Sequence, residues 1–354
     1  MLAVLPRREG CWLKECTRHV LGYMSTGASI RTSTMGLFCS RARRTSSAAF
    51  FFLGVSAVLL PAAGKADRSR PQPHQHELRA DGRLYLDDPL QKLIKEVPEL
   101  KGIRAAENQE GLPAILRRTG QEVDQFFDNV VDLVAHEEIR QERDGIRSAG
   151  RPVEDNYLIL RRKEEDEVTR FDEFRMNDKG ERIDERVARS GFLVTSGFAL
   201  IGMQFSTALQ AESKFRYLGE QKVGKRETYA VAFAQLPGQA DLAVTMRRSD
   251  GVEVHMLMQG VAWVDREHFH IVRMRTDLLS PQPGDGLEEQ TTKVDFSEVR
   301  LQDLATPLWL PKEVVVYLKV GRSPRTPFEV GFKNIHHYTD YRRYRVTTKM
   351  VEPH

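Results

Sequence analysis

The sequence has few cysteines and no long apolar run. Its 354 residues include three cysteines, Cys11, Cys16 and Cys39. The chain after residue 66 therefore has no disulfide, no thiolate nucleophile and no cysteine metal ligand to offer. The longest uncharged apolar run, residues 48–60, is shorter than the ~20 residues that a membrane-spanning helix needs.

The sequence also lacks a large excess of charge of either sign, and it lacks the strong catalytic motifs. The chain has 53 Lys and Arg against 50 Asp and Glu, whereas nucleic-acid binding usually shows a concentrated basic patch. There is no Walker loop and no glycine-rich dinucleotide fingerprint. The zinc-protease pattern begun by His136 has Arg140 where the second histidine is required, and Ser196 lacks the flanking glycines of a hydrolase elbow. The sequence indicates no catalytic residue, no metal and no cofactor.

Residues 1–66 are predicted to be an export segment. Three arginines (Arg41, Arg43 and Arg44) precede the apolar run and small residues follow it, the order of a signal peptide at about 41–66. The alternative is an uncleaved anchor, and Met35 is a candidate for the true start. Without residues 1–66 the chain has 44 basic and 48 acidic residues, a net −4. We expect a periplasmic or secreted protein whose mature chain does not span a membrane.

A flexible leader at 67–83 and a helical region at 84–150 are expected next. One helix is predicted to start at Pro89, because an apolar stripe follows at Leu90, Leu93, Ile94 and Val97. A second stripe, over residues 113–143, predicts a longer helix. Such stripes can bind a membrane or a partner, but they more often pack against a sheet.

From about Tyr157 the apolar period changes to two, which predicts an antiparallel domain over 151–354. Ser249, Asp250 and Gly251 indicate a hairpin between strands at 243–247 and 252–258. Further strands are expected at 261–264, 269–274, 293–299, 313–320 and 341–347. Helices first and strands after predict an α+β fold, in which a strongly curved antiparallel sheet, an incomplete barrel, has helices as a lid.

Two groups of histidines are weak candidates for a site. His336 and His337 are adjacent, so in a strand they point to opposite faces and do not readily share one metal. His255, His268 and His270 could approach one another across a hairpin, although isolated surface histidines are the better interpretation. No carboxylate stands at a defined distance from His255, His268 and His270.

Aromatic side chains are the more informative feature of the predicted strands. On a curved sheet, the aromatics of one face would line a concave interior. That interior is a core if side chains fill it, and a pocket for an apolar ligand if the helices cover it loosely. The candidate ligand-binding residues are Phe215, Tyr229, Phe233, Trp263, Trp309 and Tyr317.

The order of strand motifs resembles a known family. The motifs are SKFRYLGEQKVGKRETYAVAF at 213–233, GVAWVDREHFHIVRMRTD at 260–277, LWLPKEVVVYLKV at 308–320 and HHYTDYRRYRV at 336–346. Over about 192–346 the chain is similar to the outer-membrane lipoprotein-sorting carriers and their Lol-type half-barrel relatives, and most similar to secreted bacterial homologues of unassigned function. The resemblance implies an incompletely closed barrel that holds acyl chains, with no cofactor and no reaction. The long helical segment and the loop at 281–286 depart from the short carriers.

Three functions follow from these observations. The leading hypothesis is a non-enzymatic periplasmic or secreted protein that binds a lipid or acyl chain between sheet and helices, with a lipoprotein or envelope protein as a further partner. The second is a cell-envelope interaction module with a filled core. The third is a hydrolase that uses Asp265, His268 or His255, which requires a cleft where a histidine meets a carboxylate.

Overall fold

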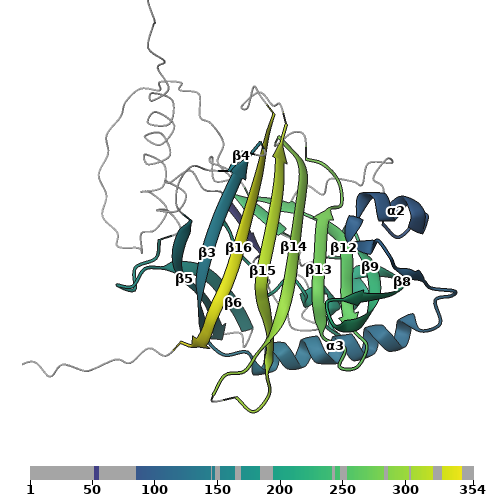
Figure 1. The fold of residues 1–354 in the computed structure, drawn as a ribbon, viewed down its shortest axis with the longest axis horizontal. Helices are drawn as coiled ribbons and strands as arrows, with labels where there is room; N and C mark the ends of the chain where they lie inside the picture. Colours follow the sequence, from purple (N-terminus) through teal and green to yellow (C-terminus); the bar gives the residue numbers. More distant parts are fainter. Residues whose placement is uncertain are drawn as a thin grey trace, which may run out of the picture.

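The protein is described here by a computed structural model (Figure 1). It describes residues 52–55, 85–144, 146–147, 152–163, 169–183, 194–240, 244–247, 253–282, 286–302, 304–321 and 329–344. The predicted leader at 67–83, the turn at 249–251 and all of the predicted export segment except residues 52–55 lie outside these ranges.

A twelve-stranded sheet forms the body of the molecule. Its order is β2 (Arg104–Ala105), β8 (Ser213–Val223), β9 (Arg226–Gln235), β12 (Met258–Asp265), β13 (Ile271–Leu278), β14 (Leu287–Val299), β15 (Leu308–Val320), β16 (Val330–Arg343), β3 (Leu133–Arg143), β5 (Val153–Lys163) and β6 (Thr169–Met176), with β4 (Ile146–Arg147) on β3. Every pair is antiparallel. Within the described residues no pairing joins β2 to β6, so the sheet is open. The predicted α+β class with an antiparallel sheet is confirmed.

A second, four-stranded sheet has the order β11 (Glu253–Met256), β10 (Val244–Arg247), β1 (Phe52–Val55) and β7 (Val194–Thr195). Strands β10 and β11 pair in antiparallel register, as the predicted hairpin requires. Strand β1 comes from the apolar run at 48–60 and pairs with β10 and β7.

Both predicted helices are present: α2 (Leu90–Glu96), which the 3-10 helix η1 (Pro98–Leu100) follows, and α3 (Leu112–Asn129). The prediction that the second helix reaches residue 143 is wrong, because Val130 is extended and the chain continues as β3. Side chains alternate between buried and less buried along β3, but one buried position holds Glu137. An acidic residue at a core position hid the period of two.

Strand β3 is hydrogen-bonded to both β5 and β16, across the domain boundary that the sequence suggested near residue 150. Strand β16 also begins earlier than the last strand predicted at 341–347, since it runs from Val330 to Arg343. Strand β5 follows β3 closely along the chain, whereas β16 lies near the end of the sequence, so no local pattern shows the pairing of β16 with β3.

The two faces of the large sheet carry separate apolar clusters. On the face towards α2, Trp263 and its neighbours pack against Leu93, Val97 and Leu100. The other face packs against α3 and against residues 198–205, the interior segment, which ends in the 3-10 helix η2 (Met203–Phe205) and is followed by η3 (Gln210–Glu212). In Figure 1, α3 runs across the ends of β13, β14 and β15.

Gly120 allows α3 to approach the interior segment closely. A Cβ at Gly120 would lie 2.6 Å from Gln210 Nε2 and 3.1 Å from the Phe205 carbonyl oxygen. The Gln210 amide donates to the carbonyl oxygens of Leu116 and Phe205, both at 2.8 Å. The glycine therefore costs some helix propensity but lets one amide bridge the helix and the segment beneath it.

Candidate functional site

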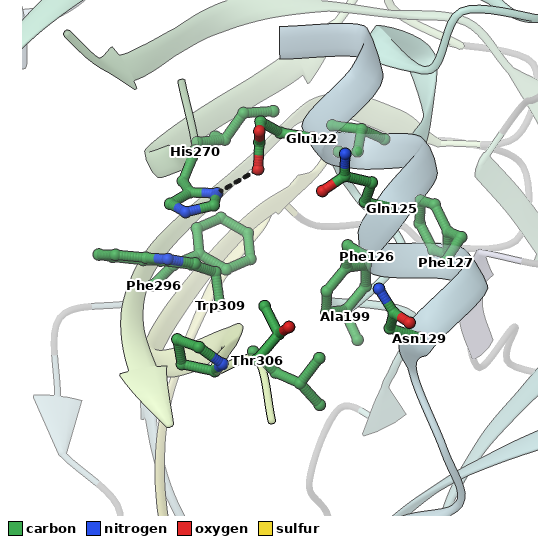
Figure 2. Close-up of a pocket in the computed structure, with 15 residues that line it drawn as sticks. Glu122, Gln125, Phe126, Phe127, Asn129, Ala199, His270, Phe296, Thr306 and Trp309 are labelled. Atoms are coloured by element: carbon green, nitrogen blue, oxygen red, sulfur yellow. Dashed lines mark ion pairs between the residues drawn. The ribbon is translucent and has the colours of Figure 1, made fainter. Parts of the chain in front are cut away.

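A cleft opens between α3 and the ends of β13, β14 and β15 (Figure 2). Its empty space, counted together with the open solvent at its mouth, is about 680 Å³. Helix α3 forms one wall with Glu122, Val123, Gln125, Phe126, Phe127 and Asn129. The remaining lining residues are Ala199, Gly202, His270, Ile271, Phe296, Thr306, Pro307, Leu308 and Trp309.

Helix periodicity explains the wall that α3 provides. Glu122, Phe126 and Asn129 are spaced by four and three residues, so they share one stripe of the helix. Ile115 faces the buried cluster, and Val123 contacts both that cluster and the cleft. On the opposite wall, Phe296 comes directly after a register shift between β14 and β15, and such irregularities re-aim side chains.

One histidine and one carboxylate meet at the top of the cleft. His270 Nδ1 lies 3.4 Å from Glu122 Oε2, and the imidazole stacks on the Trp309 indole with 5.2 Å between ring centroids. Burial, reinforced by nearby His268, lowers the pKa of His270 to about 4. Burial also raises the pKa of the Glu122 carboxyl. At neutral pH His270 is therefore an uncharged neighbour of Glu122.

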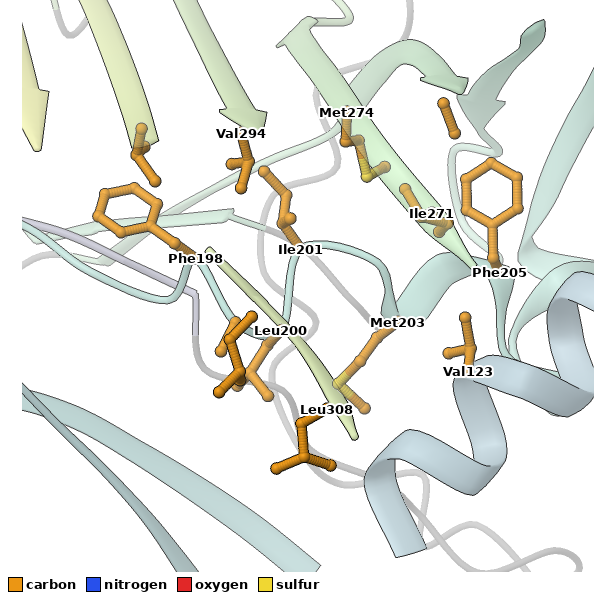
Figure 3. Packing of buried hydrophobic residues seen from close by; sticks show 14 of the residues in the cluster. Val123, Phe198, Leu200, Ile201, Met203, Phe205, Ile271, Met274, Val294 and Leu308 are labelled. Atoms are coloured by element: carbon orange, nitrogen blue, oxygen red, sulfur yellow. The ribbon is translucent and has the colours of Figure 1, made fainter. Parts of the chain in front are cut away.

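The structure divides the six predicted ligand-binding residues among several environments. Trp309 lines the cleft. Phe215 and Phe233 pack on Phe205 of the interior segment, with ring centroids 5.2 and 5.6 Å apart. Figure 3 shows that Phe205 and the other labelled residues of this segment lie among core residues of the sheet and α3.

The other three predicted residues lie elsewhere. Tyr229 is half-buried beside Tyr217 and Phe269. Trp263 lies on the α2 face, where its indole N–H donates to Gln221 Oε1 at 2.8 Å. The side chain of Tyr317 is exposed. The sequence missed Glu122, Phe126 and Phe296, although the helical spacing of the first two was readable.

The candidate histidines are not gathered into one site. His336 is buried, whereas His337 is only half-buried and lies 3.3 Å from Glu313, which confirms that the pair points to opposite faces. The rings of His268 and His270 are 6.0 Å apart, whereas His255 belongs to β11 of the other sheet.

Asp265, the third candidate of the hydrolase hypothesis, fastens a turn. Its carboxylate accepts the backbone N–H groups of Glu267 and His268 at 3.1 and 2.8 Å, and it pairs with Arg226 at 3.0 Å. Although burial opposes the charge, these hydrogen bonds and Arg226 lower the pKa of Asp265. The hydrogen bonds that Asp265 accepts therefore hold the turn together, which is a structural role.

A buried polar network joins side chains of β3, β6 and β16. The Glu137 carboxylate accepts two hydrogen bonds from Arg175, at 2.7 and 2.8 Å, and one from Tyr338 at 2.8 Å. His336 Nδ1 lies 2.8 Å from the same carboxylate, and its Nε2 lies 3.1 Å from Thr195 Oγ1. Although burial opposes the charge, Arg175 and His336 lower the pKa of Glu137 to about 2.

A second carboxyl, the partly buried Glu173, lies where the chain enters the interior segment. It accepts hydrogen bonds from the Tyr157 hydroxyl and from the Gly197 backbone N–H, the latter at 3.1 Å. Burial outweighs these donors and raises the pKa of Glu173 to about 7. Glu137 is closed off from solvent and Glu173 is partly buried, with protein donors around both carboxyls, so we interpret the network as an anchor for residues 195–197 rather than as a binding site.

Glu173 gives the protein a characteristic pH dependence. Its folded-state pKa is above the unfolded value near 4.5, so the folded chain holds this proton more tightly. Its contribution to the free energy of unfolding should be greatest below pH 4.5 and should fall as the pH rises to 7. We expect Glu173→Gln to remove that fall, as measured by urea unfolding at pH 5 and pH 7.5. An identical slope in the variant would contradict this prediction.

Within the described ranges, no three His, Cys, Asp or Glu side chains gather as a metal site would require. None of the helices in those ranges is long and apolar enough to cross a membrane.

No family model matches the sequence, and no curated protein matches it significantly. Solved structures do. A DUF1329 family protein from Desulfovibrio piger is 14% identical with a TM-score of 0.32, covering 67% of this chain and 94% of its own. An outer membrane lipoprotein-sorting protein domain from Vibrio parahaemolyticus is 13% identical with a TM-score of 0.34, covering 66% and 94%.

A LolA superfamily protein from Nitrosomonas europaea is 9% identical to this chain with a TM-score of 0.29, covering 64% of this chain and 94% of its own. Two of these structures carry the name of the family that the strand motifs resemble. At these identities and scores the likeness carries no function with it.

Proposed function

We propose that this protein is a non-enzymatic, exported binder of an amphiphile, and that the cleft beside α3 receives the apolar chain. The observation that carries the proposal is the composition of the cleft, in which Phe126, Phe127, Phe296, Leu308 and Trp309 surround a space open to solvent on one side. Ligand sites in proteins are typically concave and lined mostly by apolar side chains with a few polar groups, and the cleft has this composition.

The location of the cleft refines the hypothesis of a hollow barrel. The sheet would act as an incomplete, strongly curved barrel with α3 as its lid. The interior segment occupies the space beneath the strands that carry Phe215 and Phe233. The ligand is therefore expected at the α3 end, against Trp309 and Phe296, and not along the whole sheet. A periplasmic or secreted location follows from the predicted export segment.

Replacing Phe126 by alanine tests the proposal. The ring forms part of the helical wall, and losing its contacts with an alkyl chain should weaken binding of a dodecyl amphiphile about tenfold. Calorimetry on the purified protein measures this affinity. Tyr317→Ala is the matched control, because this exposed aromatic does not line the cleft. Equal losses in both variants, or no binding of a dodecyl amphiphile by the wild type, would refute the proposal.

A hydrolase is the second candidate, and the 3.4 Å approach of His270 to Glu122 in an open cleft favours it. A neutral imidazole oriented by a carboxylate can act as a general base. If the cleft only binds, the wild type and His270→Gln will hydrolyse p-nitrophenyl esters of fatty acids at the same rate. A rate that falls about a hundredfold in the variant would replace the binding function with this one.

A further inference from the structure

We infer that the cleft selects amphiphiles whose polar head carries an ammonium cation, with Glu122 as the residue that recognises the charge. The inference rests on the proposed binding function, since it assigns the head group of a ligand whose apolar chain lies in the same cleft. It concerns which amphiphile is bound, and it stands on the charges around Glu122.

Two titratable residues line the cleft among the described side chains, Glu122 and His270. Because His270 is neutral at pH 7, Glu122 is the charged one. The other polar lining residues, Gln125, Asn129 and Thr306, are uncharged. An anionic head would therefore meet an acid and no lysine or arginine on these walls. A cationic head would meet a carboxylate and the amide oxygens beside it.

The Glu122 carboxylate has no cationic ion-pair partner among the described residues. Its ion-pair contact in those ranges is with His270, whose pKa near 4 leaves it uncharged at neutral pH. His268 and Arg118 partly offset the burial that raises the pKa of Glu122, but the Arg118 guanidinium lies over the Phe269 ring, 3.8 Å from its centroid. The charge of Glu122 is thus partly desolvated, with 30% of its side chain exposed, and lacks a close counter-ion.

Aromatic rings lie close enough to take part. Phe126 belongs to the same helical stripe as Glu122, and Phe296 lies on the opposite wall, as Figure 2 shows. The faces of phenylalanine rings attract ammonium groups. The indole of Trp309 already stacks on His270 and lies under the Arg226 guanidinium, 4.7 Å from the ring centroid. We therefore expect Trp309 to contact the alkyl chain of the ligand rather than its cationic head group.

Three dodecyl amphiphiles that differ only in the head group test the inference. Dodecyltrimethylammonium, dodecyl sulfate and dodecyl maltoside are titrated into the purified protein by calorimetry at pH 7.5 and 0.15 M salt, below their micelle concentrations. We expect the ammonium compound to bind about tenfold more tightly than the sulfate, because attraction and repulsion at one partly exposed carboxylate each contribute a few-fold. The maltoside should fall between them.

Two substitutions that each remove one negative charge distinguish recognition of the head group by Glu122 from an effect of the overall negative charge of the chain. In Glu122→Gln the three amphiphiles should bind within about twofold of one another. In Asp128→Asn, an exposed position on α3 outside the cleft, the tenfold preference should remain. A preference that survives Glu122→Gln, or disappears equally in both variants, overturns the inference.

The two proposals fail in different ways. If the three amphiphiles bind the wild type equally, the head-group inference is wrong and the binding function stands. If none binds, the binding function is wrong and the inference falls with it.

Discussion

Replacing Arg175 with methionine should lower the free energy of unfolding by about 3–5 kcal/mol. The guanidinium and the Glu137 carboxylate are both fully buried and joined by two hydrogen bonds. Methionine has a similar length but cannot donate, so the carboxylate would remain in the interior without its cation. The Thr195 carbonyl oxygen, which accepts from Arg175 at 2.9 Å, would lose the same donor. Urea unfolding followed by circular dichroism measures the effect.

A surface ion pair on the neighbouring strands β5 and β6 provides the matched control. Arg162 and Asp172 lie 2.7 Å apart with side chains 63% and 44% exposed. Exposed pairs contribute about 0–1 kcal/mol, so Arg162→Met should leave stability nearly unchanged. Similar losses in the Arg162 and Arg175 variants would show that burial is not what makes the Arg175 pair matter.

Removing both charges of the buried pair should cost less than the two single losses added together. In Glu137→Leu with Arg175→Met no unpaired buried charge remains, although His336 and Tyr338 lose their acceptor. Partners in one network are non-additive by about 0.5–3 kcal/mol. Strictly additive losses would mean that Glu137 and Arg175 stabilise the sheet independently, and not as a pair.

The sequence predicted the local elements well and the long-range ones poorly. Apolar spacing was sufficient for α2 and for most of α3, and alternation was sufficient for most strands. The buried network depends on the pairing of β16 with β3, which brings His336 to Glu137 across 199 positions. No local pattern encodes that pairing, and in isolation an acid at a core position of β3 indicates an exposed surface.

Of the six aromatic residues predicted to bind a ligand, Trp309 lines the cleft and the other five do not. The register of the strands decides which aromatics share a face, and the sequence does not show that register. Phe233 pairs with Gly260, and Trp263, three positions further along β12, therefore points to the opposite face. The position of Phe296 depends on a register shift between β14 and β15. In contrast, Glu122 and Phe126 lie within one helix, where the sequence alone fixes their common side.

Phe205→Ala should lower the free energy of unfolding by about 3–5 kcal/mol. The ring is completely buried in η2 and contacts both Phe215 and Phe233. Alanine would leave a cavity between the interior segment and the sheet. The Gln210 side-chain amide, which donates to the carbonyl oxygens of Leu116 and Phe205, limits how far the segment can collapse. Phe205→Leu, which keeps most of the apolar volume, should cost about 1–2 kcal/mol.

The same variant decides whether the interior is filled. A closed apolar cavity can bind benzene, so benzene should raise the melting temperature of Phe205→Ala and leave that of the wild type unchanged. Because Phe205 does not line the cleft, affinity for a dodecyl amphiphile should change by less than about twofold. If benzene stabilises the wild type equally, the space beneath β8, β9 and β12 is already hollow, and the ligand would have a second place to lie.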